Sequence, residues 1–246
     1  AFVAVVCVIF LVRSYRAGLA IGIGILAAQY FGAKDDKMIR ATVANSNYVL
    51  AVTGTAVSLL GFFLAPWLLH LLKVPEGIFP MSLSYLRVTS LGVVAVALYN
   101  GVASLLRALG DSQSPLYFLI LSCFLNIALD LLFVLKLQMG VYGVGLATVI
   151  SQVFSFVISA VYAVTRVSYF RLSRQEWRPN RQIILRCLRL GIPMALQSAL
   201  IAVSSMVLQG VVNSFGQTVM AAYTVVCKVE QIVQMPYNAL GAAITS

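Results

Sequence analysis

Charged residues are scarce in this sequence: only 10% of its 246 residues are Asp, Glu, Lys or Arg, and histidine occurs once. An ordinary soluble domain carries roughly 25% charged residues, so a soluble globular protein is excluded. Disorder, coiled coil and collagen are excluded as well, because each needs a polar, heptad-charged or glycine-periodic composition. With 61% hydrophobic residues and a mean hydropathy of +0.96, the composition is that of a polytopic membrane protein.

The sequence also lacks the residue groupings that carry catalysis or bind metals. Its four cysteines, at positions 7, 123, 187 and 227, have no paired spacing, so they indicate neither a disulfide framework nor a zinc site. No Ser/His/Asp set, phosphate-binding loop or cluster of metal-binding His and Cys occurs in it. We therefore expect a protein that is not an enzyme and that holds no cofactor and no structural metal.

Long apolar runs dominate the chain. A helix needs about 20 mostly apolar residues to cross a bilayer, whereas a β-barrel strand needs about ten that alternate strictly. The runs do not alternate, which predicts an all-α membrane protein, a polytopic helical bundle of about seven transmembrane helices. They cover 1–31, 42–72, 81–106, 115–135, 141–165, 188–212 and 218–246. The chain opens at Ala1 without the charged start of a signal peptide and ends within an apolar run, so we expect a fragment.

Basic residues are divided unequally between the two sides of this predicted bundle. If the seven segments alternate in direction, eleven cations fall on one side, while the short loops of the other side hold only Lys73 and Lys136. By the positive-inside rule the basic side is cytoplasmic. This distribution explains the net charge of +10 by the orientation of the protein in a lipid bilayer and not by binding to nucleic acid. The eleven are Lys34, Lys37, Arg40, Arg107, Arg166, Arg171, Arg174, Arg178, Arg181, Arg186 and Arg189.

Polar side chains within the apolar runs are the candidate functional groups, because an ionisable group in lipid costs several kcal/mol unless it faces a partner or a cavity. Asp130 follows Asn126 by four residues, so both lie on one face of a helix. A tight turn centred near Gln138 brings the next helix back, and Thr148 is about as far beyond that turn as Asp130 is before it. We expect a carboxylate, an amide and a hydroxyl to meet roughly 12 to 15 Å below the membrane surface.

Such a cluster has three interpretations. It can hold a proton on the carboxylate, it can coordinate a hard cation such as sodium through Asp130 and Asn126, or it can be a structural hydrogen-bonded knot. Spacing alone does not choose among them. Elsewhere, Glu230 and Lys228 are expected to form a polar site with other helices, and Arg13 and Arg16, which share a face, to line a polar cavity. Arg87 is expected to snorkel toward the interface.

Six stretches of the sequence form a distinctive set: GILAAQYFGAKD (24–35), LLRALGDSQSP (105–115), LNIALD (125–130), GVGLATVISQ (143–152), LGIPMALQS (190–198) and VNSFG (212–216). Together they resemble the MATE family, the multidrug and toxic compound extrusion transporters. The resemblance implies a fold of twelve helices in two six-helix lobes, of which this chain looks like helices two to eight. A partial N-lobe of five helices would cover 1–165, a cytoplasmic Arg-rich linker 166–187, and the first two helices of the C-lobe 188–246.

The resemblance also implies a function: a secondary antiporter that exports cationic amphipathic compounds in exchange for protons, or for sodium, by alternating access. The proton-coupled branch has an Asn and an Asp a turn apart on the fifth helix and a Thr on the sixth, which match Asn126, Asp130 and Thr148. Its partner Asp on the first helix has no counterpart in this chain. Sodium-coupled relatives add a carboxylate in the seventh helix, and 188–212 contains none, which favours protons. We expect a multi-pass monomer in the cell membrane, with small cationic drugs as its partners.

Two other functions stay open. A lipid-linked oligosaccharide flippase has a related architecture, and Arg13, Arg16 and Lys228 would suit its pyrophosphate substrate. Competition between lipid-linked sugars and cationic dyes would separate a flippase from an exporter. A retinal-binding seven-helix photoreceptor would use Lys228 as its Schiff base, although neither tryptophan lies deep enough in a segment to hold the polyene.

Overall fold

The structure is a computed structural model that describes residues 18–71, 76–77, 79–173, 175–214, 222–223, 225–230, 232–236 and 240. All of the regular structure in these residues is helical, and no strand occurs among them. The elements are a helix at Gly18–Gly32, α2 (Asp36–Leu71), α3 (Phe79–Ala108), α4 (Gln113–Leu131), the π-helical η1 (Leu132–Lys136), α5 (Gly140–Arg166), the 3-10 turn η2 (Ser168–Phe170) and α6 (Arg181–Ser214).

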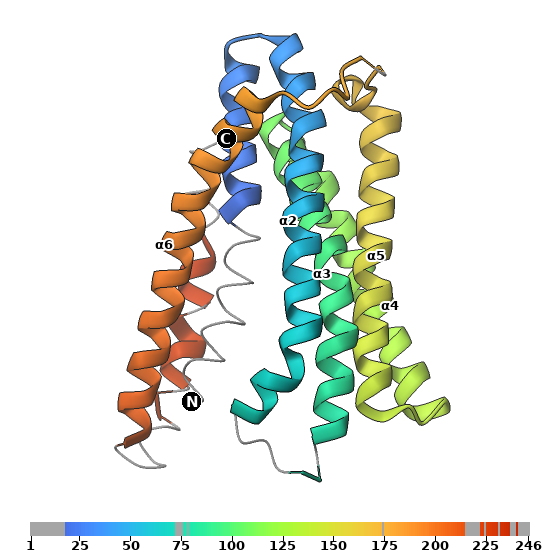
Figure 1. The fold of residues 1–246 in the computed structure, drawn as a ribbon, viewed down its shortest axis with the longest axis vertical. Helices are drawn as coiled ribbons and strands as arrows, with labels where there is room; N and C mark the ends of the chain where they lie inside the picture. The colour runs from blue at the N-terminus through green and yellow to red at the C-terminus, as the bar shows by residue number, and fades with distance from the viewer. Residues whose placement is uncertain are drawn as a thin grey trace.

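Five of the described helices are long and apolar enough to cross a membrane: Asp36–Trp67, Phe79–Ala108, Gln113–Lys136, Gly140–Arg166 and Arg181–Ser205. They correspond to the five middle runs of the seven predicted, which confirms the all-α membrane class (Figure 1). The Gly18–Gly32 helix is the described part of the first run. Much of the predicted 218–246 segment lies outside the described residues.

Helix α3 is the centre of the described bundle, and its most extensive contacts are with α2 on one side and α5 on the other (Figure 1). Half of the most apolar stretch of α3 is buried, against 6% of that of α4. Helix α4 lies at the edge of the bundle and packs mainly on α5. Small residues set the spacing. A Cβ on Gly54 of α2 would lie 3.3 Å from the Cβ of Ala97, and one on Gly145 of α5 would lie 3.3 Å from the ring of Tyr85.

One face of α5 carries small residues every fourth position, which lets neighbouring helices approach closely. The buried members of this row are Gly143, Ala147, Ser151, Ser155, Ser159 and Ala163. The Ser122 hydroxyl of α4 donates to the Ser151 carbonyl at 2.7 Å, which joins α4 to α5.

Asp111 fastens the short loop between α3 and α4. Its carboxylate accepts a hydrogen bond from the Ser114 backbone N–H at 3.0 Å and another from the Tyr162 hydroxyl of α5 at 2.9 Å. Burial raises the pKa of Asp111, but the hydrogen bonds from Ser114, Tyr162 and Gln113 together outweigh burial and hold its pKa below the ordinary value. The ionised carboxylate therefore stabilises this end of the bundle.

The non-helical connection between α5 and α6 is shorter than the predicted linker at 166–187, because α6 begins at Arg181. Asn180 starts the helix: its side-chain oxygen accepts a hydrogen bond from the Gln182 N–H at 3.0 Å, and its carbonyl accepts one from the Ile184 N–H at 3.0 Å. A side-chain acceptor at this position satisfies an otherwise unpaired N–H of the first turn. The arginines on both sides of Asn180 hide this start in the hydropathy pattern.

Candidate functional site

The hairpin made by α4, η1 and α5 positions the predicted cation site. Gln138, with φ 52°, and Gly140, with φ 56°, adopt the left-handed conformation in the turn, which confirms the turn predicted near Gln138. The Met139 N–H donates to the Phe133 carbonyl at 2.9 Å. A Cβ on Gly143 would lie 2.9 Å from the Cβ of Phe133, so the glycine allows α5 to approach η1 closely.

The π-helical turn η1 follows Asp130 by two residues. In a π-helix the hydrogen bond spans five residues, as it does from the Leu137 N–H to the Leu132 carbonyl at 3.0 Å. Such turns are rare and occur often at functional sites. Nothing in the sequence predicts this one.

Asn126 and Asp130 carry the central observation of the site. Both side chains are partly buried, and the Nδ2 of Asn126 and the Oδ1 of Asp130 are fully buried without a hydrogen-bond partner in the part of the chain that the structure describes. Buried polar atoms normally have partners, and an unpaired one costs about 1 to 3 kcal/mol. Among the described residues only two other buried side-chain atoms share this condition, on Arg87 and Ser155.

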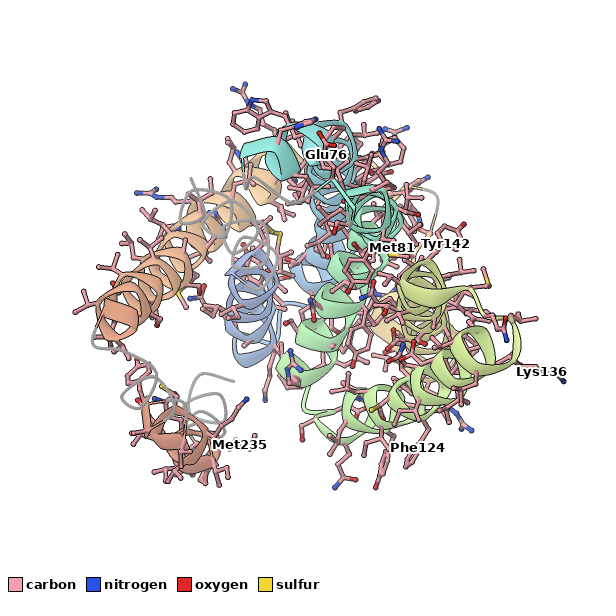
Figure 2. The ribbon with its side chains drawn as sticks, turned by 90° about the horizontal axis from the view of Figure 1, so that it is seen from below. Glu76, Met81, Phe124, Lys136, Tyr142 and Met235 are labelled. Carbon is pink, nitrogen blue, oxygen red and sulfur yellow. The ribbon has the colours of Figure 1, made fainter. Side chains whose placement is uncertain are left out.

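The two sides of α4 differ, since one is exposed and apolar and the other carries Asn126 and Asp130. Figure 2, viewed along the bundle, shows Phe124 pointing away from it and Lys136 projecting outward at the η1 turn. The exposed face of α4 is apolar, as a surface against lipid tails requires. Asn126 and Asp130 therefore interrupt a largely apolar helix at positions where one polar atom of each side chain is buried.

Thr148 lies on α5, but its hydroxyl donates to the Val144 carbonyl of its own helix at 2.9 Å. Within the described residues no hydrogen bond joins Thr148 to Asn126 or Asp130. The structure thus places the carboxylate of Asp130 and the amide of Asn126 on α4, and the hydroxyl of Thr148 on α5. Because this hydroxyl donates its proton within α5, its oxygen can still accept a hydrogen bond or bind a cation. The direct meeting of all three groups stays a prediction.

The other predicted polar residues are spread widely. Glu230 accepts a hydrogen bond from the Gln234 amide at 2.8 Å, as the shared helix face suggests, and both side chains are exposed. Lys228 is exposed too, and within the described residues it forms no ion pair with Glu230. Arg13 and Arg16 lie outside the described residues.

Sequence reasoning missed the partner of Arg87. Its guanidinium lies over the ring of Phe62 on α2, 5.2 Å from the ring centroid, and its Nε is buried without a partner in the described chain. A cation over an aromatic face is attracted by the quadrupole of the ring, whose face is electron-rich, so this contact holds Arg87 against α2. The simple expectation of snorkelling overlooked it, because Phe62 is one of many apolar residues of α2 and no sequence spacing links it to α3.

Comparison with known proteins gives consistent matches over most of the chain. The MatE family model matches residues 1–132. The probable multidrug resistance protein YoeA of Bacillus subtilis (strain 168) is 31% identical over 243 residues, which are 96% of this chain and 52% of YoeA. The multidrug export protein MepA of Staphylococcus saprophyticus is 25% identical over 215 residues, 87% of this chain and 48% of MepA.

Among solved structures, a MATE protein in the bent conformation superposes with a TM-score of 0.89 at 24% sequence identity. The match covers 96% of this chain and 53% of that protein. At this identity the likeness shows the fold alone. The chain spans about half the length of the relatives it matches.

Proposed function

Since the chain belongs to the MATE family, we propose that it is part of a secondary antiporter that exports cationic amphipathic compounds in exchange for protons by alternating access. The relatives support the drug-export part of this proposal, because YoeA and MepA are named for multidrug resistance and multidrug export. The apolar helical bundle supports a multi-pass membrane protein. Small cationic drugs and the lipid bilayer are then its partners, and it needs neither catalysis nor a cofactor.

The observation that carries the coupling role is the unpartnered pair on α4. A carboxylate oxygen buried within a membrane helix without a hydrogen bond is costly as an anion, and binding a proton or a cation relieves that cost. Asp130 is therefore the coupling group, and Asn126 its neighbour one turn away. Protonation removes one charge from the packed interior and changes which of two helix arrangements is favoured.

Sodium is the alternative coupling ion at the same place. It would take oxygen ligands from Asp130 and Asn126, with the Thr148 hydroxyl as a third. The absence of a carboxylate from 188–212 is the reason to place protons first. In this proposal the protein is a monomer in the cell membrane, and the Arg-rich side with the 166–187 segment faces the cytoplasm. Arg13 and Arg16 line a polar cavity, and Glu230 and Lys228 belong to a polar site of the second lobe.

The test is dye efflux driven by a pH gradient in everted vesicles that contain the complete gene product, in sodium-free buffer. We expect Asp130→Asn to abolish the gradient-dependent efflux at matched expression. Glu76→Gln is the matched control, because it neutralises an exposed carboxylate outside the apolar helices. Efflux by Asp130→Asn at the wild-type rate would contradict the assignment, and efflux that appears only with a sodium gradient would replace protons by sodium.

A further inference from the structure

The first turns of α6 are packed into the core formed by the preceding helices. Ile183 and Cys187 have no exposed surface, and they belong to the same apolar cluster as Leu19, Ile23 and Phe170. That cluster continues along α2 and α3. By its packing, the beginning of α6 is thus a part of the bundle that precedes it.

The connection before α6 is fastened to α2 by several independent contacts. The Asn180 backbone N–H donates to the side-chain oxygen of Asn45 at 2.7 Å, and the Tyr48 hydroxyl donates to the Trp177 carbonyl at 2.9 Å. The rings of Tyr48 and Trp177 also meet edge to face, with centroids 5.9 Å apart. These contacts fix the start of α6, since Asn180 is the residue from which the helix begins.

The backbones of α6 and the Gly18–Gly32 helix touch at a pair of glycines, and the two helices lie side by side in Figure 1. A Cβ on Gly22 would lie 2.6 Å from both the N and the Cα of Gly191, and a Cβ on Gly191 would lie 3.0 Å from the Cα of Leu19. The Arg186 guanidinium adds a hydrogen bond to the Tyr30 hydroxyl at 2.6 Å. From its first residue to Gly191, α6 is therefore held against the preceding helices.

Directly beyond this contact the helix is weakened. Pro193 lies inside α6 and has no N–H, so it donates no hydrogen bond to the carbonyl of Arg189, and Gly191 removes side-chain packing within the same turn. One turn further on, the backbone of Ala195 contacts Gly18 more closely than Gly191 contacts Gly22. Past it, most of the large apolar side chains of α6 whose exposure is described face outward, although Val203 is half-buried and Val212 is buried.

We propose that residues 181–191 of α6 move with the preceding bundle, and that the helix bends at Gly191–Pro193 when the two lobes rearrange. The boundary of movement then lies within α6 and not in the 167–180 connection, and the contact of Ala195 with Gly18 is the first to separate. This inference rests on the alternating access of the proposed function. It extends that function by naming the segment that bends.

Distances between spin labels test the proposal in the complete gene product. The exposed residue Val157 on α5 serves as reference, and Leu185 and Leu200 are exposed positions before and after the bend. We expect the distance distribution of the pair Val157→Cys and Leu185→Cys to be the same at acidic and neutral pH, with and without tetraphenylphosphonium. The pair Val157→Cys and Leu200→Cys should shift by several Å. Equal shifts in both pairs would overturn the proposal, as would no shift of Leu200 in protein that transports.

Two further variants separate the bend from a general loss of structure. Pro193→Ala restores the missing N–H and so strengthens α6 at the proposed bend. We therefore expect efflux to be several-fold slower, with unchanged binding of tetraphenylphosphonium. Pro66→Ala, in the interior of α2, is the control and should transport at the wild-type rate. A disulfide between Tyr48→Cys and Trp177→Cys should leave efflux intact. Loss of efflux on cross-linking, restored by reduction, would show that this connection must open and would overturn the proposal.

These outcomes are distinguishable from failure of the proposed function. If wild-type vesicles show no efflux, the exporter proposal fails, but the two spin-label distances can still be compared across pH and with ligand. If efflux is normal and both labelled positions on α6 move together, the exporter proposal stands and the bend at Gly191–Pro193 does not.

Discussion

Gly22 is a position at which one added methyl group should test the packing of α6 directly. A Cβ there lies 2.6 Å from the N and Cα of Gly191, about 1 Å closer than ordinary carbon contacts. Because the obstacle is backbone, the two helices must separate to make room. Overpacking of this kind costs about 1 to 3 kcal/mol, while alanine in a helix gains roughly 0.5 to 1 kcal/mol over glycine. We expect Gly22→Ala to destabilise the protein by about 1 kcal/mol, near the middle of the difference between these two ranges.

Gly32→Ala is the matched control for this substitution. Gly32 belongs to the same helix, and a Cβ there meets no atom within 4 Å. Thermal unfolding of the complete gene product in detergent, followed by size-exclusion chromatography after heating, measures both variants. The midpoint of Gly22→Ala should lie below wild type and that of Gly32→Ala at or slightly above it. If Gly22→Ala is as stable as Gly32→Ala, the helix backbones do not touch as described and the reasoning fails.

Two other substitutions probe the contacts that order the chain at the same end. Asn45→Ala removes the acceptor of the Asn180 N–H, so trypsin should cleave the 167–180 connection faster, whereas Asn47→Ala, whose amide bonds only its own helix, should leave the cleavage rate unchanged. Tyr162→Phe removes one hydrogen bond from Asp111, whose lowered pKa makes it stabilising above the ordinary pKa of Asp, with that stability lost as pH falls through the lowered pKa. The variant brings this pKa closer to the ordinary value of Asp, so its thermal midpoint should fall by less on acidification and level off at a higher pH than that of wild type. Coincident pH profiles of the two proteins would refute the role of Asp111.

Hydropathy predicts the membrane-crossing part of each helix because that part must be apolar, but it does not predict where a helix begins. Helix α2 starts at Asp36, six residues before the apolar run at 42–72. Asp35 accepts a hydrogen bond from the Met38 N–H at 3.1 Å, which caps a polar first turn. The early start of α6 after Asn180 has the same cause. Both starts depend on single side chains and not on the average composition of a window.

At the site, the sequence specifies spacing along one helix more directly than contacts between helices. The four-residue interval puts Asn126 and Asp130 on one face, and each of them has one buried polar atom without a partner among the described residues. The π-helical turn at Leu132–Lys136 changes the rotation of the chain just beyond Asp130, and the Thr148 hydroxyl bonds its own helix. Contacts across helices depend on rotations of this kind, which a single sequence does not encode in any local pattern.

The measurement that tests the central claim most directly is proton release on substrate binding. The complete gene product, in detergent and weakly buffered near the midpoint of its transport pH profile, is mixed with tetraphenylphosphonium while the pH of the solution is recorded. If Asp130 exchanges a proton for the cation, wild type releases protons and Asp130→Asn releases none, although both stay folded. Equal proton release from the two proteins would contradict the account, because the coupling proton would then come from another group.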